Sequence, residues 1–192
     1  EVIKQVSQEI YSTGKVTDKS EIGTYWWNEF QKAFNSAYED SFETQRKLEY
    51  ESLKKTIEYF NSTANAKELS DLMFAHWIKP PIFEESKQFF EMCPVPIYVV
   101  SNIDRDDVLK AIEYHALKPN GIFTSEDAKS YKPRKELFQF ALNSTGLSAE
   151  QVVHIGDSLS SDIKGASAVG INAIWINRSK REIPNGVTAV EN

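Results

Sequence analysis

The pattern of apolar residues changes at Lys79-Pro80-Pro81, and this change constrains the fold more than any other feature of the chain. Before it, apolar residues recur at the spacing of amphipathic helices. After it, short continuous apolar runs alternate with helical stretches, which is typical of an α/β fold with a mostly parallel sheet. The sequence therefore predicts a helical domain at residues 1–78 and an α/β domain at residues 79–192.

Four apolar stripes mark the helices expected in the first part, at residues 2–10, 22–37, 48–60 and 69–77. Gly14 ends the first stripe. Ser41 is the expected N-cap of the third helix, because a serine hydroxyl can accept a backbone N–H at that position. Four helices joined by short connections predict a small helical bundle.

Two apolar runs give the clearest strands of the second part. The run Ile-Tyr-Val-Val at 97–100 predicts a strand buried on both faces of a parallel sheet, and Val-Val-His-Ile at 152–155 predicts a second strand. His154, inside the second run, is expected to lie in the core. Shorter strands are expected at 122–123 and 171–176. Helices are expected at 104–116, with Asp104 as N-cap, and at 133–143 and 160–169.

The composition excludes several classes of protein. Of the 192 residues, 41% are hydrophobic and 26% are charged, as in an ordinary globular protein rather than a disordered or fibrous one. No apolar run reaches the roughly 18 residues of a membrane span. The net charge of −6 argues against a nucleic-acid polymer as partner. Cys93 is the only cysteine, so no internal disulfide can form, and a reducing, cytoplasmic location is expected.

Polar residues follow both main strands, where ligands bind in open parallel sheets. Ser101 and Asn102 follow the first strand; Asp157 follows the second, with Asp162 in the next helical turn. Asp157 is a suitable Mg²⁺ ligand, because this ion prefers one or two carboxylates with waters and phosphate oxygens. The Ser101 hydroxyl and the side chain or backbone amide of Asn102 can donate to a phosphate, and Lys132, just before a helix, can balance its charge. Taken singly, each residue also fits an ordinary turn or a solvated surface.

As an ordered set, these residues resemble motifs II, III and IV of the haloacid dehalogenase superfamily. The segments that carry the resemblance are Val99–Asn102, Lys132-Pro133 and Gly156–Asp162, and the likeness covers about residues 80–190. It implies a Rossmann-like core with an inserted all-helical cap of the C1 type. It also implies Mg²⁺-dependent hydrolysis of a phosphate ester through an aspartyl-phosphate intermediate.

The resemblance assigns a role to each matched residue. Ser101 and Asn102 would hold the phosphoryl oxygens, and Lys132 would balance the charge of the nucleophile and the phosphate. Lys132 and Ser101 are thus the catalytic residues that this chain is expected to supply. Asp157 would bind Mg²⁺, and Asp162 would support the metal site without direct ligation or through a water.

Motif I of the superfamily, a strand that ends in Asp-x-Asp-x-Thr, does not occur before Ser101. That motif supplies the nucleophile and the general acid/base. Either a strand that carries it precedes Glu1 in a longer protein, or the chain is a non-catalytic binding protein. We favour the first alternative, because a sheet without its central strand leaves strand edges exposed.

Within the superfamily, the expected activity is that of a phosphatase similar to the nucleotidase and phosphoglycolate phosphatase branch. The expected substrate is a small phosphorylated metabolite, either a mononucleotide or a sugar phosphate. A metal-independent 2-haloacid dehalogenase is the alternative, and the carboxylate of Asp157 at the expected metal position argues against it. The protein is expected to be a monomer or a homodimer.

Overall fold

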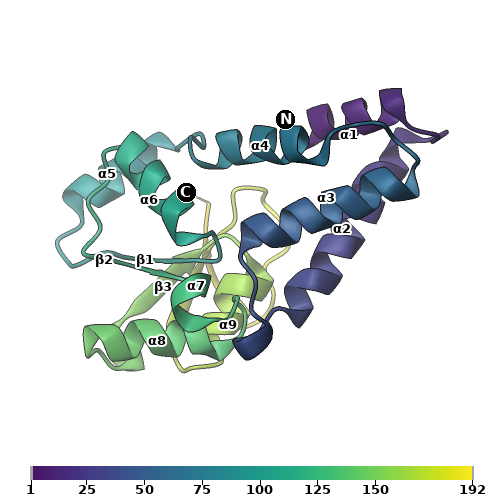
Figure 1. The fold of residues 1–192 in the computed structure, drawn as a ribbon. Helices are drawn as coiled ribbons and strands as arrows, with labels where there is room; N and C mark the ends of the chain where they lie inside the picture. Colours follow the sequence, from purple (N-terminus) through teal and green to yellow (C-terminus); the bar gives the residue numbers. More distant parts are fainter. Residues whose placement is uncertain (1, 192) are drawn as a thin grey trace. The chain divides into compact units, whose positions relative to one another are not determined.

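The computed structural model describes residues 2–191 and shows an α/β protein with parallel strands (Figure 1). The chain forms two compact units. Unit 1 comprises Glu1–Ile82 and Ile103–Leu117, and unit 2 comprises Phe83–Asn102 and Lys118–Asn192. Unit 1 therefore includes a helix that follows the first strand in sequence, in addition to the expected helical part.

Unit 1 is all helical, and α1 to α4 share one apolar core. It contains α1 (Val2–Thr13), α2 (Lys19–Ser36), α3 (Gln45–Tyr59), α4 (Ala66–Trp77), α6 (Arg105–Tyr114) and the 3₁₀ turn η1 (Glu39–Ser41). The helices predicted from the four apolar stripes are confirmed. Each of α1 to α4 contributes to this core an apolar side chain that is at most 1% exposed, namely Ile10, Ile22, Leu53 and Met73.

The predicted N-cap of the third helix is wrong. Thr44, not Ser41, precedes α3, and its side chain accepts the backbone N–H of Lys47 at 3.4 Å. Ser41 lies in η1, where its hydroxyl donates to the carbonyls of Ser36 and Tyr38 at 3.0 and 2.8 Å. Local hydrogen bonding to preceding carbonyls competes with capping for such a residue, and here it prevails.

A clamp made of Asp104 and Asp107 ties α6 to the start of α3. The buried Asp104 carboxylate accepts the backbone N–H groups of Gln45 at 2.7 Å and Arg46 at 2.9 Å. A helix N-terminus carries unpaired N–H groups and favours a negative charge. Arg46 Nε donates to Asp107 at 2.7 Å, and its guanidinium stacks on Phe74 at 4.1 Å. Asp104 thus occupies the predicted N-cap position of α6, while its carboxylate caps α3.

Unit 2 contains two parallel sheets. In the first, β1 (Tyr98–Ser101) pairs with β2 (Gly121–Thr124). In the second, β3 (Val153–Gly156) pairs with β4 (Asn172–Ile176), which pairs with β5 (Thr188–Val190). Among residues 2–191, β1 and β3 each have a single strand partner, so each leaves one edge unpaired.

The expectation that the strand at 97–100 is buried on both faces is wrong. Every residue of β1 is only half-buried. In β3 the side chains alternate between the two faces, and Val153 and Ile155 are 55% and 43% exposed. Both strands lack a neighbour on one edge within the described chain, and this is why such apolar runs remain accessible.

The helices of unit 2 are α5 (Glu84–Met92), α7 (Ser125–Ala128), α8 (Lys135–Thr145), the 3₁₀ turn η2 (Ala149–Gln151), the π-helical turn η3 (Leu159–Lys164) and α9 (Gly165–Ser167). The predicted helix at 133–143 is confirmed as α8, and it ends at Gly146, whose positive φ of 69° suits a helix C-cap. Phe138 of α8 packs with Ala166 and Ile171 in a buried apolar cluster. No helix in the described chain is both long and apolar enough to cross a membrane.

Candidate active site

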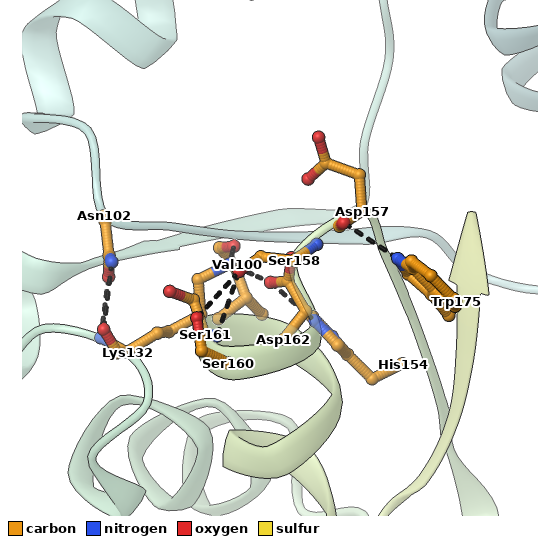
Figure 2. A network of polar contacts seen from close by, with 10 residues as sticks. All are labelled: Val100, Asn102, Lys132, His154, Asp157, Ser158, Ser160, Ser161, Asp162 and Trp175. Carbon is orange, nitrogen blue, oxygen red and sulfur yellow. Dashed lines mark hydrogen bonds and ion pairs between the residues drawn. The ribbon is translucent and has the colours of Figure 1, made fainter. Parts of the chain in front are cut away.

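Lys132 links β1 to the turn that follows β3. It lies between α7 and α8 and is 8% exposed. Its Nζ donates to the carbonyl of Val100 in β1 at 2.9 Å and to Oδ1 of Asp162, in η3 after β3, at 2.6 Å (Figure 2). The ammonium group therefore lies within reach of both β1 and the turn that follows β3.

Asn102 holds the backbone of Lys132 in place. Its Oδ1 accepts the Lys132 N–H at 2.7 Å, and its Nδ2 donates to the Lys132 carbonyl at 3.2 Å. The carbonyl of Asn102 accepts in turn from the hydroxyl of Ser125 at 3.0 Å. Both polar atoms of the Asn102 side chain are thus engaged with the backbone of Lys132.

Asp162 uses both carboxylate oxygens. Oδ1 accepts from Lys132 and, at 3.1 Å, from Nε2 of His154; Oδ2 accepts the backbone N–H of Ser158 at 3.0 Å. Burial alone raises the pKa of the Asp162 carboxyl. The hydrogen bond from His154, the charge and hydrogen bond of Lys132 and the Ser158 N–H outweigh it and hold that pKa well below its ordinary value. Asp162 is therefore ionised at neutral pH.

Gly156 allows Asp162 to lie this close to β3. A Cβ atom at Gly156 would overlap the Cβ and Cγ atoms of Asp162. The requirement is one of space, because the close neighbour is the first part of the Asp162 side chain, which cannot swing away without moving the carboxylate. Ser158 is the N-cap residue of η3, and its hydroxyl accepts the Ser161 N–H at 3.0 Å.

Asp157 presents a free carboxylate at the end of β3. Its side chain is exposed, and no hydrogen bond or ion pair joins it to another residue of the described range 2–191. Its backbone carbonyl accepts the indole N–H of the fully buried Trp175 at 2.9 Å. Figure 2 shows the carboxylate directed away from Asp162 and its partners. The loop is thus fixed while the carboxylate stays available.

This donor set fits a hard cation in part. One free carboxylate is what Mg²⁺ takes from a protein when waters and phosphate oxygens complete its shell. Within the described residues, no group of three or more His, Cys, Asp or Glu side chains is arranged to hold a metal, so the set does not fit a closed all-protein site. Asp162 has both oxygens engaged, which suits support of such a site without direct ligation.

Hydrogen bonds join three of the predicted site residues, Asn102, Lys132 and Asp162. Ser101 ends β1, in register with Thr124 of β2. His154 belongs to the same polar cluster, although the sequence predicts it only as a core residue. The only feature of the sequence that could have indicated this role is that His154 is the one polar residue in the apolar run 152–155.

A family model described as haloacid dehalogenase-like hydrolase matches residues 3–176. The chain belongs to this family. Two curated relatives illustrate its range. A phosphoserine phosphatase of Thermus thermophilus is 24% identical over 60% of this chain and 49% of its own length. The pyrimidine 5'-nucleotidase YjjG of Escherichia coli is 36% identical over 33% of this chain and 28% of its own length. This member of the family thus spans less than half of each relative.

Solved structures of the family show the same fold at low sequence identity. A crystallised dehalogenase has a TM-score of 0.76 and 16% identity, with 100% of this chain and 88% of the other covered. YfnB of Bacillus subtilis, crystallised with magnesium, has a TM-score of 0.74 and 19% identity, with 98% and 84% covered. These likenesses confirm the predicted α/β fold of haloacid dehalogenase-like hydrolases.

Proposed function

We propose that this chain is part of a Mg²⁺-dependent phosphohydrolase that cleaves a small phosphorylated metabolite through an aspartyl-phosphate intermediate. The observation that carries the proposal is the free Asp157 carboxylate, held at the end of β3 in the same loop as the buried Asp162. A free carboxylate is suited to a cation, whereas beside an anionic substrate without metal it would only repel. This favours a phosphatase over a metal-independent 2-haloacid dehalogenase.

The residues of this chain have distinct tasks in the proposed reaction. An ammonium group has three donors, and the contacts of Lys132 with Val100 and Asp162 use two of them. The third would bind a phosphoryl oxygen, where the charge of Lys132 stabilises the negative charge of the transition state. Ser101 would donate its hydroxyl to another phosphoryl oxygen. Asn102 would contribute its backbone N–H, because its side chain is engaged with Lys132.

The attacking aspartate would come from a strand that is not among the described elements. β1 and β3 each leave an edge unpaired, and Lys132 reaches both β1 and the turn after β3. A parallel strand seated on these edges would join the two sheets and would end beside Ser101 and Asp157. We propose that this strand carries the nucleophile and the general acid/base.

Asp157 would hold the Mg²⁺ ion, and Asp162 would support it by fixing the loop through the Ser158 N–H. Bound there, the ion would neutralise charge on the phosphoryl oxygens. We further propose that the α/β domain at 79–192 carries the chemistry and that the helical domain at 1–78 selects the substrate.

Mononucleotides and sugar phosphates are the proposed substrate classes. Relatives named as a pyrimidine 5'-nucleotidase and a glyceraldehyde 3-phosphate phosphatase support this choice. We propose a cytoplasmic location, because the single cysteine, Cys93, is typical of proteins of a reducing compartment. The proposed assembly is a monomer or a homodimer.

The test is a release assay with the full-length protein. Phosphate release from a panel of phosphorylated metabolites and p-nitrophenyl phosphate is measured with Mg²⁺ and with chelator, and halide release is measured from 2-haloacids. Mg²⁺-dependent phosphate release is the expected result. Halide release without phosphate release would support the dehalogenase. The absence of both activities would support a non-catalytic binding protein.

A further inference from the structure

His154 lies in β3 and directs its ring at the Lys132–Asp162 pair. Its Nε2 is 3.1 Å from Oδ1 of Asp162, the same oxygen that accepts from Lys132 (Figure 2). Its side chain is 13% exposed, and its ring packs against the ring of Phe138 in a T-shaped arrangement at a centroid distance of 5.1 Å. The ring is thus held between the core of unit 2 and the carboxylate.

The direction of the hydrogen bond follows from the ionisation of Asp162. An ionised carboxylate has no proton to donate, so Nε2 of His154 must carry the hydrogen. The backbone N–H of Ser158 holds the other oxygen, Oδ2, at 3.0 Å. Two donors of fixed position, one on each oxygen, therefore define the plane and the rotation of the carboxylate. Lys132 is the flexible partner, with four side-chain torsions.

We infer that His154 is a positioning residue, which places the Lys132 ammonium by fixing the Asp162 carboxylate through its Nε2–H. This inference rests on the proposed function for its catalytic consequence, since Lys132 is the group proposed to bind the phosphoryl oxygen. The positioning role does not require a change of charge on His154. It requires only that Nε2 carries a hydrogen and that the ring is held between Phe138 and Asp162.

A purely structural role makes a different prediction. If His154 only fills space in β3, an apolar residue of similar size replaces it without loss at Lys132. If the N–H matters, a glutamine, whose terminal amide can lie near the place of Nε2, rescues what a leucine loses. The variants His154→Leu and His154→Gln therefore separate the two roles, and His76→Leu removes a histidine from unit 1 as a matched control.

Two measurements on the full-length protein test the inference. The first is the ¹⁵N–¹H NMR signal of the Lys132 ammonium, identified by its loss in Lys132→Met. We expect it to be protected in the parent protein and His154→Gln, and shifted or lost in His154→Leu. The second is the steady-state rate of phosphate release. We expect kcat to fall by about tenfold or more in His154→Leu, with a smaller change in KM, as is usual when an outer partner of a site residue is removed.

The two measurements distinguish a failure of the positioning role of His154 from a failure of the proposed phosphatase activity. An unchanged Lys132 signal in His154→Leu, or equal losses in the leucine and glutamine variants, would overturn the positioning role. If the parent protein releases no phosphate, the proposed function fails, and the NMR comparison alone decides whether His154 places Lys132. Rescue by glutamine in both measurements, with His76→Leu unaffected, would support the inference.

Discussion

The Lys132 ammonium and the Asp162 carboxylate lie 2.6 Å apart, and their side chains are only 10% and 8% exposed. Such a pair contributes less to stability than its short distance implies, because both charges have left water. Breaking it is costly all the same, since the remaining partner stays buried and unpaired. The pair is therefore better explained by the chemistry of the site than by stability.

Replacing Lys132 by alanine should remove most turnover, because the proposed transition state loses its cation. Stability should also fall, by about 3–5 kcal/mol, since the charge of Asp162 is left without its partner. Urea unfolding and kcat for phosphate release measure both effects. The double variant Lys132→Ala/Asp162→Asn is the control: it should recover stability but not turnover. A near-normal kcat in Lys132→Ala would remove the proposed role.

The carboxyl of Asp162 should contribute to an acid-dependent loss of stability. Its pKa is lower in the folded protein than in the unfolded chain, where the ordinary value is 3.8. This contribution is therefore fully present well above pH 4 and is lost as the pH falls below that value towards the folded pKa. The free energy of unfolding between pH 2 and pH 7 should fall less steeply on the acid side in Asp162→Asn. An identical pH dependence in the variant would contradict this.

Glu49 in α3 should make the protein less stable as the pH rises. Burial raises the pKa of this carboxyl to about 7, although a hydrogen bond from Gln45 opposes the shift. The unfolded chain releases the proton at lower pH, so stability falls from about pH 4.5 to about pH 7 and then levels off. The loss is on the order of 3 kcal/mol at most. Glu49→Gln should abolish this slope in urea unfolding, whereas Glu58→Gln, on the exposed face of α3, should keep it.

Replacing Asp157 by asparagine should weaken Mg²⁺ binding strongly and leave the fold intact. The side chain is exposed and makes no hydrogen bond or ion pair among residues 2–191, so its charge can be removed without breaking a structural contact. Calorimetric titration with MgCl₂ measures the affinity, and circular dichroism checks the fold. Asp40→Asn, an exposed aspartate in η1, is the matched control. Equal affinity in Asp157→Asn and the parent protein would show that the metal assignment is wrong.

Replacing Gly156 by alanine should displace Asp162, because the added Cβ would overlap the first atoms of that side chain. Forcing extra volume into a packed site costs roughly 1–3 kcal/mol. Gly23→Ala is the control, since a Cβ there meets nothing within 4 Å and α2 should gain roughly 0.5–1 kcal/mol. Thermal unfolding of the two variants should therefore shift in opposite directions. A Gly156→Ala protein as stable as the parent would contradict the close approach.

The fold was predictable from the sequence where a local pattern decides the structure. The helical stripes of unit 1 and the apolar runs of β1 and β3 are such patterns, and each appears at its expected place. The strand-end rule likewise places Ser101 and Asp157 at the ends of β1 and β3. Other elements carry weaker signals, and α5, α7 and β5 were not predicted. Their conformation depends on what they pack against.

The partners of the polar side chains were less predictable. Asp104 was expected to serve its own helix, yet its carboxylate caps α3, 59 residues earlier in the sequence. Asn102 is predicted to bind a phosphate through its side chain or its backbone amide, and the sequence does not reveal that its side chain holds the backbone of Lys132. His154 was expected only to fill the core. The partners of Asp104 and Asn102 come from distant parts of the chain, which spacing along the sequence does not reveal. The partner of His154 is nearer, since Asp162 follows it by eight residues, but it lies beyond the end of β3 in η3.

The clamp between α3 and α6 has a consequence for how the protein is made. Arg46 and Asp107 are 61 residues apart. At a synthesis rate of about 5–20 residues per second, the ribosome needs roughly 3–12 seconds to produce Asp107 after Arg46. During that interval the first turn of α3 has neither its capping carboxylate nor its ion pair. The nascent helical unit must therefore wait for a segment encoded beyond the first strand, and slow codons between these positions would prolong its exposure to chaperones and proteases.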